Sequence, residues 1–459
     1  IEELKSALPG AWTTDADDMA PWLTEWRGRW TGETPILLQP RSTDEVARAI
    51  EICARHGVAV VTQGGGTGLV GGQIPFGEVL LSTRKLRTVR DVTPLDDAMT
   101  LEAGVTLLEA QQLAREKDRF FPLSLAAEGS ATIGGVISTN AGGTAVLRYG
   151  MMRDLVLGIE AVMPDGQLFN GLKRLRKDNT GYDLKQLFIG AEGTLGVVTA
   201  ATLKLFPIMR SRATAIVGLE SHHAAVALLA RAKAETGGGV EAFELMKRLG
   251  MALVLKNIPD TREPLESTPP WYVLIELTSG EPGGADAAME RLLTNAFEEG
   301  LIIDAAIAQN DAQKAAFWRL REEHSAGLKP EGGGWKHDVS VPVSQIAAFI
   351  DEATAAVEKF HPGCRVSVFG HVGDGNLHYD VIPGVGEDVP AFIARWMEGS
   401  EVVHDIVARY NGSISAEHGL GRLKTDEARR YKSPLEIATM QAIRQALDPQ
   451  RIMNPAVLF

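Results

Sequence analysis

The sequence predicts a protein of mixed helices and strands with two or three domains. A glycine-rich part of the chain precedes a part that carries most of the histidines. At 459 residues, the chain is longer than one hydrophobic core usually serves. Its three glycine clusters all fall in the first 200 residues, whereas seven of its ten histidines lie between His324 and His418. This division predicts that the first part binds a cofactor and that the second part contributes the chemistry.

The composition is that of a soluble globular protein, with 45% apolar and 23% charged residues. A net charge of -13 argues against a nucleic-acid partner, although a pocket can still attract a small anion. No apolar run is long enough for an integral membrane segment, and the first residues lack the features of a secretory signal. These features predict a cytoplasmic location. Only Cys53 and Cys364 are present, which excludes a disulfide framework and a cysteine-based metal site.

The first glycine cluster, Gly64–Gly72, follows a predicted helix and a buried strand. Ser42-Thr43-Asp44-Glu45 is a capping box that starts the helix, Gly57 ends it, and Val58–Val61 forms the strand. The cluster contains the dinucleotide pattern Gly-x-Gly-x-x-Gly. That pattern requires a helix at the loop, and the following Gln73-Ile74-Pro75 does not begin one. A tight turn is the alternative. The bare N–H groups favour a pyrophosphate cradle that needs no helix.

Two further glycine clusters follow, and the texture changes after about Pro207. The second cluster spans Gly134–Gly143 and the third spans Gly190–Thr199. Beyond them, we expect a helix over His222–Glu235, a strand over Trp271–Leu277 and a helix over Asp311–Leu328. Spacings of three and four residues would place Trp318, Arg321 and Ser325 on one face of the last helix.

Four separated motifs, in order, resemble those of the vanillyl-alcohol oxidase type flavoprotein superfamily. Val61–Gly72 looks like its FAD pyrophosphate loop, Ser130–Gly143 its second FAD segment and Gly190–Thr199 its third. The ending Leu447–Pro455 also matches. The resemblance implies an α+β fold with a two-subdomain FAD-binding module of this type and an α+β substrate (cap) domain with an antiparallel sheet. The expected bounds are 1–206 for the FAD-binding domain, 207–420 for the substrate and metal domain, and 421–459 for a C-terminal tail returning to the FAD domain.

The same resemblance supplies the FAD-binding residues. They are Gly64, Gly65, Gly66, Thr67, Gly68, Leu69, Ser130, Thr132, Gly135, Thr139, Asn140, Gly142, Gly143, Glu192, Gly193, Val198 and Asn454. Several relatives tether FAD through a histidine in or near these segments. Because no histidine lies between His56 and His222, we expect FAD to be bound non-covalently.

A predicted β-hairpin carries the most informative histidines. If Asp374-Gly375 forms a two-residue loop, His371 lies directly opposite His378, with Cβ atoms about 5 Å apart, and Asp380 lies on the same face. Two imidazoles at that separation can share a metal ion. Two incidental histidines on a hairpin are the alternative. Glu417 offers a third ligand, since two histidines and a carboxylate form a zinc-type set, although Glu417-His418 could also be a surface or capping pair.

Both segments also resemble those of the FAD-linked D-2-hydroxy acid dehydrogenases, which include D-2-hydroxyglutarate and D-lactate enzymes. The resemblance implies that His371, His378 and Glu417 bind a divalent metal, usually zinc, and that His418 lies at the reacting carbon. It also implies that Arg321, Ser325 and Lys336 hold the substrate carboxylate, although surface ion pairs are the alternative. Ser325 replaces the usual threonine. Asp380 replaces an expected asparagine, and its charge would repel a substrate carboxylate.

These expectations predict an enzyme that oxidises a D-2-hydroxy acid by hydride transfer to FAD, with His418 as general base. Lys336 favours a dicarboxylate such as D-2-hydroxyglutarate. A D-lactate or glycolate dehydrogenase, a flavin alcohol oxidase, a zinc hydrolase and a non-catalytic flavin-binding subunit are the alternatives. The expected electron acceptor is an electron-transfer flavoprotein or a quinone, and a homodimer is possible. The sequence does not distinguish zinc from manganese.

Overall fold

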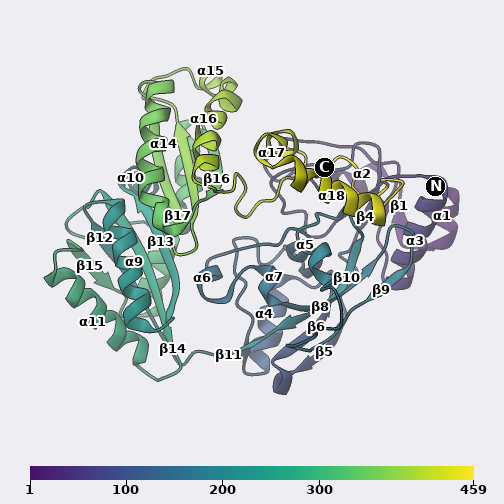
Figure 1. The fold of residues 1–459 in the computed structure, drawn as a ribbon, viewed down its shortest axis with the longest axis horizontal. Coiled ribbons are helices and arrows are strands. Elements are labelled where there is room, and N and C mark those ends of the chain that lie inside the picture. Colours follow the sequence, from purple (N-terminus) through teal and green to yellow (C-terminus); the bar gives the residue numbers. More distant parts are fainter. The chain divides into compact units, whose positions relative to one another are not determined.

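The computed structural model describes all 459 residues and divides into two compact units. The first unit comprises residues 1–143, 149–208 and 417–459, so that both termini belong to it (Figure 1). The second unit comprises residues 144–148 and 209–416. Each unit has its own sheets and its own covering helices.

The first unit begins with a small sheet around the first glycine cluster. Its strand order is β1 (Trp12–Thr13), β2 (Leu37–Leu38), β4 (Val79–Ser82) and β3 (Val60–Gln63). The last three strands are parallel to one another. Helices α1 (Glu2–Ala7), α2 (Ala16–Leu23) and α3 (Thr43–His56) accompany it. The glycine cluster leaves the end of β3, and no helix opens there. This agrees with the prediction from Gln73-Ile74-Pro75.

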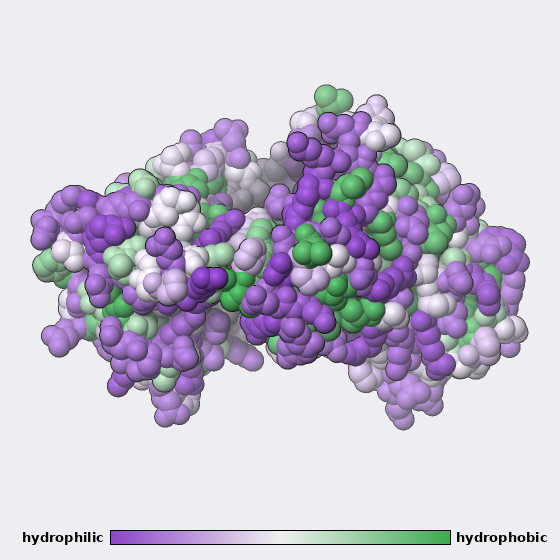
Figure 2. All heavy atoms as spheres, turned by 90° about the horizontal axis from the view of Figure 1, so that it is seen from below, coloured by the Kyte–Doolittle hydropathy of each residue, from purple (hydrophilic) through white to green (hydrophobic).

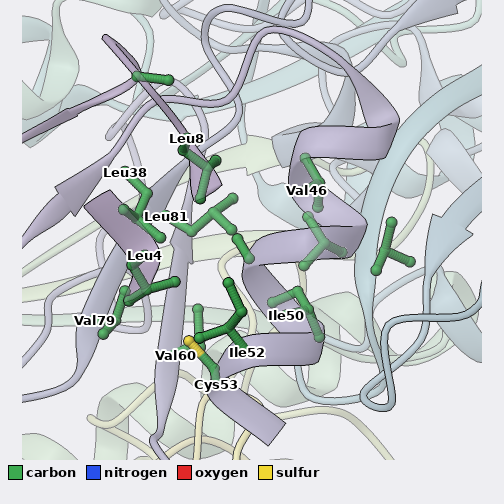
Figure 3. Packing of buried hydrophobic residues seen from close by; sticks show 14 of the residues in the cluster. Leu4, Leu8, Leu38, Val46, Ile50, Ile52, Cys53, Val60, Val79 and Leu81 are labelled. Atoms are coloured by element: carbon green, nitrogen blue, oxygen red, sulfur yellow. The ribbon is translucent and has the colours of Figure 1, made fainter. Parts of the chain in front are cut away.

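Helix α3 is held at both ends and packs one face on this sheet. The Ser42 side chain accepts a hydrogen bond from the N–H of Glu45, and Gly57 ends the helix in the left-handed region, as predicted. Figure 3 shows Val46, Ile50 and Cys53 of α3 among aliphatic side chains of α1 and the strands. This core fixes the start of the glycine loop.

A five-stranded antiparallel sheet forms the rest of the first unit. Its order is β5 (Val89–Thr93), β6 (Ala98–Glu102), β10 (Val197–Lys204), β8 (Val156–Val162) and β9 (Leu168–Asn170). A two-stranded ladder pairs β7 (Arg119–Phe120) with β11 (Phe206–Pro207). The short helices are η1 (Pro94–Asp96), α4 (Leu107–Glu116), α5 (Ile133–Ser138), α7 (Met152–Leu155) and α8 (Lys185–Phe188). Helix α6 (Val146–Tyr149) lies almost wholly in the segment 144–148 that belongs to the second unit.

The C-terminal segment of the first unit returns to the first sheet. After α17 (Thr425–Tyr431) and α18 (Pro434–Leu447), the chain runs beside β3. The N–H of Val60 donates to the carbonyl of Ile452 at 2.8 Å, and the N–H of Asn454 donates to the carbonyl of Val60 at 2.8 Å. The last residues therefore lie next to the strand that leads into the glycine loop.

The second unit is a seven-stranded antiparallel sheet with helices on both faces. Its order is β15 (Asp304–Ile307), β12 (Ser211–Leu219), β14 (Trp271–Ser279), β13 (Val240–Lys247), β17 (Arg365–His371), β18 (Asn376–Ile382) and β16 (Trp335–Ser340). One group of helices is α9 (His222–Thr236), α11 (Gly284–Glu298), α14 (Ile346–Phe360), α15 (Val389–Ala394) and α16 (Trp396–Arg409). The other is α10 (Arg248–Asn257), α12 (Asp311–Glu322) and α13 (His324–Leu328), and short turns η2 (Lys329–Glu331) and η3 (Val343–Gln345) complete the unit.

The face of this sheet that meets α10, α12 and α13 changes from apolar to polar along its width. At the β12–β14–β13 side, Ile216, Leu274 and Met246 pack against the three helices. Side chains two residues apart on a strand share a face, and so do directly paired residues. Met246 is paired with Phe369, and Glu244 is paired with His371, so by this rule all four side chains lie on the same face. We call this face of the sheet the helix-α12 face.

The predicted single helix over Asp311–Leu328 is wrong in one respect, because the structure divides it at Glu323. The N–H of Glu323 still bonds to the carbonyl of Arg319, but Glu323 has ψ near 4°, which turns the chain. Trp318 and Arg321 consequently point to the sheet from α12, while Ser325 is exposed on α13. The predicted common face of these three residues is therefore lost at Ser325.

Polar residues predominate on one face of the molecule. On the face shown in Figure 2, hydrophilic residues prevail and hydrophobic residues occur in small, separate groups. No helix has both the length and the apolar character needed to span a membrane. Both cysteines are buried and unpaired, as their separation in the sequence predicts.

Candidate functional site

The glycine loop after β3 directs its carbonyl groups to one side. Arg84 donates to the carbonyl of Gly64 through Nε at 2.9 Å and to that of Gly65 through Nη2 at 2.6 Å. The backbone N–H groups from Gly65 to Gly68 donate no hydrogen bond to another part of the chain. An arginine that holds the carbonyls while successive N–H groups stay available is suited to an anion cradle. The sequence reasoning missed Arg84, which no motif contains.

The loop packs against the second glycine segment so closely that side chains are excluded. A Cβ atom on Gly64 would lie 2.3 Å from Thr132 Oγ1, and one on Gly65 would lie 2.1 Å from the carbonyl oxygen of Ser130. Gly66 has φ +72°, in the left-handed region. Thr132 Oγ1 is buried without a hydrogen-bond partner. An unsatisfied hydroxyl beside free N–H groups fits the polar diphosphate of a dinucleotide.

Glu192 joins the third glycine segment to the C-terminal part of the first unit. It has φ +51°, and its carboxylate accepts from the N–H groups of Leu420 and Gly421, each at 2.9 Å. Burial raises the pKa of Glu192 to about 7, although these two hydrogen bonds act in the opposite direction. Asn454 completes the connection, because its Nδ2 donates to the carbonyls of Gly72 and Glu192, each at 2.9 Å.

The remaining residues predicted to bind FAD all belong to the first unit. Asn140 follows α5 with φ +48° and accepts a hydrogen bond from the N–H of Arg153 at 2.9 Å. A Cβ on Gly143 would lie 2.0 Å from the carbonyl oxygen of Ser124. Thr67, Leu69, Gly135, Thr139, Gly142, Gly193 and Val198 are buried or half-buried. The structure thus gathers the three predicted segments and Asn454 within one compact unit.

In the second unit, the hairpin of β17 and β18 differs in register from the prediction. A four-residue turn, Val372–Gly375, replaces the predicted two-residue loop, and His378 lies opposite Phe369 instead of His371. Gly375 has φ +95°, and the N–H of Val341 donates to its carbonyl at 3.1 Å, so the turn packs on the segment after β16. Because the register differs by two residues, the histidines keep a common face. Their ring centroids are 5.9 Å apart.

Glu244 is a buried carboxylate on β13 that the sequence reasoning missed. It lies directly opposite His371, and its side chain is 1% exposed. Its Oε1 accepts from Nδ1 of His371 at 2.7 Å, and its Oε2 accepts from Nε of Arg321 at 2.7 Å. Burial alone would raise the pKa of Glu244, but attraction by His371 and Arg321 outweighs burial and lowers this pKa to about 2. A charged carboxylate therefore joins a predicted metal ligand to a predicted substrate ligand.

Phe369 provides an aromatic platform beside these groups. The guanidinium carbon of Arg321 lies 5.1 Å from the centre of its ring, and the ring of His378 lies 4.9 Å from it. Arg321 is almost fully buried, with 9% of its side chain exposed. A guanidinium bound through Nε and stacked on a ring keeps its terminal nitrogens in a defined direction.

Lys336 and Asp380 face each other across β16 and β18. They are directly paired in the ladder, and Lys336 Nζ lies 3.8 Å from Asp380 Oδ2. Asp380 is buried, whereas 28% of the Lys336 side chain is exposed. The negative charge expected to repel a substrate carboxylate is thus offset by Lys336. The ammonium group is correspondingly less available to a second carboxylate.

Glu417 follows a segment that runs along the edge strand β16. Ser413 and Ser340 exchange backbone hydrogen bonds of 2.8 and 3.0 Å, and the N–H of Ala416 donates to the carbonyl of Asp338 at 3.2 Å. Of the three predicted metal ligands, His371 and His378 belong to the second unit, whereas Glu417 begins the C-terminal part of the first unit. The adjacent His418 is half-buried.

A separate group of two histidines and a carboxylate lies within the second unit, with its ligand atoms within 4.8 Å of one another. It consists of His222 and His223 at the start of α9 and Asp351 on α14. Nε2 of His222 lies 3.0 Å and Nε2 of His223 lies 2.8 Å from oxygens of Asp351. The sequence reasoning did not single out these residues.

Comparison with known proteins assigns the family. Residues 34–171 match the FAD binding domain model, and residues 208–458 match the model of the C-terminal domain of FAD linked oxidases. The chain therefore belongs to the FAD-linked oxidase family and is a flavin-dependent oxidoreductase with an FAD-binding domain. The fold class predicted from the sequence is confirmed.

Named relatives fall in one branch of this family. The chain is 36% identical to the mitochondrial D-2-hydroxyglutarate dehydrogenase of Arabidopsis thaliana, with 94% of this chain and 76% of the relative aligned. It is 37% identical to the rat enzyme of that name, covering 98% of this chain and 82% of the relative. A putative D-lactate dehydrogenase of Schizosaccharomyces pombe is 35% identical, covering 96% and 85%.

Solved structures support the fold. A p-cresol methylhydroxylase superposes with a TM-score of 0.76 at 16% identity, covering 100% of this chain and 96% of that one. An alkyldihydroxyacetonephosphate synthase superposes with a TM-score of 0.75 at 17% identity, covering 100% and 85%. At these identities the likeness concerns the fold alone.

The predicted cytoplasmic location is wrong by the same comparison. The plant, rat and bovine relatives and the S. pombe relative are all named as mitochondrial proteins. The prediction failed because composition and hydropathy report how a chain interacts with water, which is similar in the cytosol and in the mitochondrial matrix.

Proposed function

We propose that this protein oxidises a D-2-hydroxy acid to the 2-oxo acid, with D-2-hydroxyglutarate as the favoured substrate. The observation that carries the proposal is the arrangement on the helix-α12 face, where one buried carboxylate, Glu244, binds both the imidazole of His371, a predicted metal ligand, and Arg321. A hydroxy acid presents a hydroxyl and a carboxylate on neighbouring carbons, which such a pair is suited to bind together. The names of the plant and mammalian relatives support the same substrate.

FAD would be held non-covalently by the loop Gly64–Gly68 and by the segments around Thr132, Asn140 and Glu192. When bound, it supplies an acceptor for the hydride that leaves the α-carbon of the substrate. The fit is supported by the unsatisfied Thr132 hydroxyl and by the side-chain-free contacts of the glycine loop. Release of the flavin on denaturation would distinguish non-covalent from covalent attachment.

His371, His378 and Glu417 would hold a divalent cation, for which zinc is favoured. Two imidazoles and one carboxylate form the donor set of many zinc sites that leave a position open for substrate. The cation would lower the pKa of the substrate hydroxyl. His418 would accept the hydroxyl proton as general base, and Arg321 would bind the adjacent carboxylate through its terminal nitrogens. Ser325 is proposed as a hydroxyl donor to the substrate on the basis of the resemblance.

Turnover of pure enantiomers with an artificial electron acceptor tests this proposal. D-2-hydroxyglutarate should be oxidised, and its L-isomer should not, because the binding groups and the hydride acceptor fix one face of the α-carbon. Oxidation of both isomers at similar rates, or of neither, would reject the proposed reaction. An electron-transfer flavoprotein or a quinone as the natural acceptor, and a homodimer, remain predictions.

A D-lactate dehydrogenase is the second candidate, and the pairing of Lys336 with Asp380 favours it. Because Asp380 offsets the ammonium charge, the site has less attraction for a second carboxylate than Lys336 alone suggests. If the substrate is a dicarboxylate, Lys336→Ala should lower kcat/KM for D-2-hydroxyglutarate about tenfold or more beyond its effect on D-lactate, since a hydrogen bond to a charged group contributes roughly 1.5–3 kcal/mol. Equal losses for both substrates would favour the monocarboxylate.

A further inference from the structure

The needs of folding alone do not explain why a carboxylate, Glu244, is buried at this position. It is a charged residue in the otherwise largely apolar centre of β13, and it is buried between paired strands on both sides. Burying a carboxylate is costly unless its lone pairs are satisfied. Both oxygens of Glu244 are satisfied, and each one serves a different functional side chain.

The first contact determines which nitrogen of His371 is available to a cation. A carboxylate can only accept a hydrogen bond, so Nδ1 of His371 must carry the proton that it donates to Glu244 over 2.7 Å. Nε2 is then the unprotonated nitrogen, the one whose lone pair can bind a cation. Because the two residues are cross-strand partners in an antiparallel ladder, the orientation of the ring is fixed by the sheet itself.

The second contact determines the direction of Arg321. Its Nε donates to the other oxygen of Glu244 over 2.7 Å, and its guanidinium packs on the ring of Phe369. Phe369 is directly paired in the ladder with His378, the second proposed metal ligand. Glu244 engages the guanidinium through Nε, which leaves the Nη groups for the substrate carboxylate. The negative charge of Glu244 also balances the buried guanidinium, so that Arg321 can be kept dry before substrate arrives.

From these contacts we propose that Glu244 is a positioning residue that couples cation binding at His371 to substrate-carboxylate binding at Arg321. The inference rests on the proposed function, since it takes His371 as a metal ligand and Arg321 as a carboxylate ligand. A cation held by His371 would withdraw charge from the ring and would strengthen the Nδ1–H bond to Glu244. The carboxylate that this bond holds is the one that aligns Arg321. Metal occupancy and substrate affinity should therefore change together when Glu244 is altered.

Glu244→Gln tests the coupling, because an amide can accept from one of the two donors only and turns its own NH₂ toward the other. Zinc affinity, measured by titration against a competing chelator with no substrate present, should fall about 10- to 100-fold. With zinc restored to saturation, KM for the 2-hydroxy acid should still rise, and the metal concentration needed for half-maximal activity should rise in parallel. Flavin content should not change.

Glu276→Gln is the matched control. Glu276 is also a buried glutamate on the same sheet, on β14, where it accepts from Thr214 and Trp318, and it contacts neither His371 nor Arg321. It should leave zinc affinity and KM within about twofold of the parent enzyme. Equal zinc affinity and equal KM in Glu244→Gln and the parent would overturn the inference, as would equal effects of the two substitutions.

Glu244→Asp covers the case in which Glu244→Gln does not fold. Aspartate keeps the charge but is one methylene too short to reach both partners. If Glu244 positions its partners, Glu244→Asp should show the same losses as Glu244→Gln. If Glu244 only balances charge, Glu244→Asp should behave like the parent enzyme, and that result would overturn the inference. Zinc binding by the parent enzyme separates this test from the proposed function. If the parent binds no divalent cation, the metal part of the proposed function fails and the coupling fails with it. If the parent binds zinc and the Glu244 variants bind it equally, only the coupling fails.

Discussion

Two groups in this protein each combine two histidines with a carboxylate, namely the proposed metal ligands and a group within the second unit, and they differ in what lies behind the imidazole rings. In the group of His371, His378 and Glu417, Nδ1 of His371 is engaged by the buried Glu244, which leaves Nε2 for a ligand. In the group of His222, His223 and Asp351, both Nε2 atoms already meet the carboxylate, and Nδ1 of His222 is buried without a hydrogen-bond partner.

Residue type and distance therefore do not by themselves define a metal site. A ligating histidine needs a second group that takes its other nitrogen, fixes the tautomer and holds the ring. Glu244 does this for His371, and no carboxylate or carbonyl does so for Nδ1 of His222. Burial differs as well, since His371 is buried and His378 and Glu417 are half-buried, whereas His223 and Asp351 are exposed. We therefore place the proposed metal site at the first group, whereas the second has the character of a surface ion pair between α9 and α14.

The largest effect that would sharpen this comparison is expected from His371→Ala set against His223→Ala. Removing His371 should lower kcat/KM about a thousandfold or more, because a catalytic cation contributes several kcal/mol of transition-state stabilisation. The zinc content should fall to near zero in the same variant. His223→Ala should change neither quantity by more than about twofold. A loss of zinc or activity in His223→Ala comparable to that in His371→Ala would reverse the assignment of the two groups.

An intermediate effect is expected from breaking the ion pairs themselves. Arg321→Met leaves the Glu244 carboxylate buried beside an apolar side chain, which should lower the free energy of unfolding by about 3 kcal/mol. Asp351→Asn removes the exposed carboxylate of the other group and should change it by less than about 0.5 kcal/mol. Thermal and urea unfolding measure both variants. Similar destabilisation by both would show that burial does not distinguish the two groups.

The smallest effect concerns the response of the second group to acid. Burial lowers the pKa of His222 below its usual 6.5, and this outweighs the opposing attraction by Asp351. The unfolded chain therefore binds this proton at a higher pH than the folded chain does, so stability is lost as the pH falls through 6.5. His222→Gln should reduce the acid-side loss of melting temperature between pH 7 and pH 5, and His223→Gln serves as the exposed control. An unchanged slope in His222→Gln would contradict this account.

Much of the fold was predictable because local rules and global packing agree. The cap at Ser42, the glycine at position 57 and the loop after β3 all follow from local chemistry, and the structure has them. The prediction of the β17–β18 hairpin was correct in part. Asp374-Gly375 correctly indicated a turn, but its length was set by contacts with Val341, which is distant in sequence. The common face of His371 and His378 survived because alternation along strands tolerates a shift of two residues.

The parts that could not be predicted depend on partners from distant strands. Glu244 gave a hint, since a glutamate within Val240–Met246 interrupts an apolar strand. The sequence did not show whether that carboxylate faced solvent or a buried cation. Its partners, His371 and Arg321, lie 127 and 77 residues away. Likewise, the pairing of Lys336 with Asp380 follows from the register of β16 and β18, which local patterns leave open.

In the proposed function, a cation held by His371, His378 and Glu417 would prepare the substrate for oxidation by the bound flavin. Anaerobic reduction of the flavin by D-2-hydroxyglutarate tests this role when it is followed by absorbance before metal removal, after chelation and after addition of zinc. We expect rapid bleaching at first, a loss of about a thousandfold in the bleaching rate after chelation, and recovery with zinc. Bleaching at an unchanged rate after the metal has been removed would contradict it.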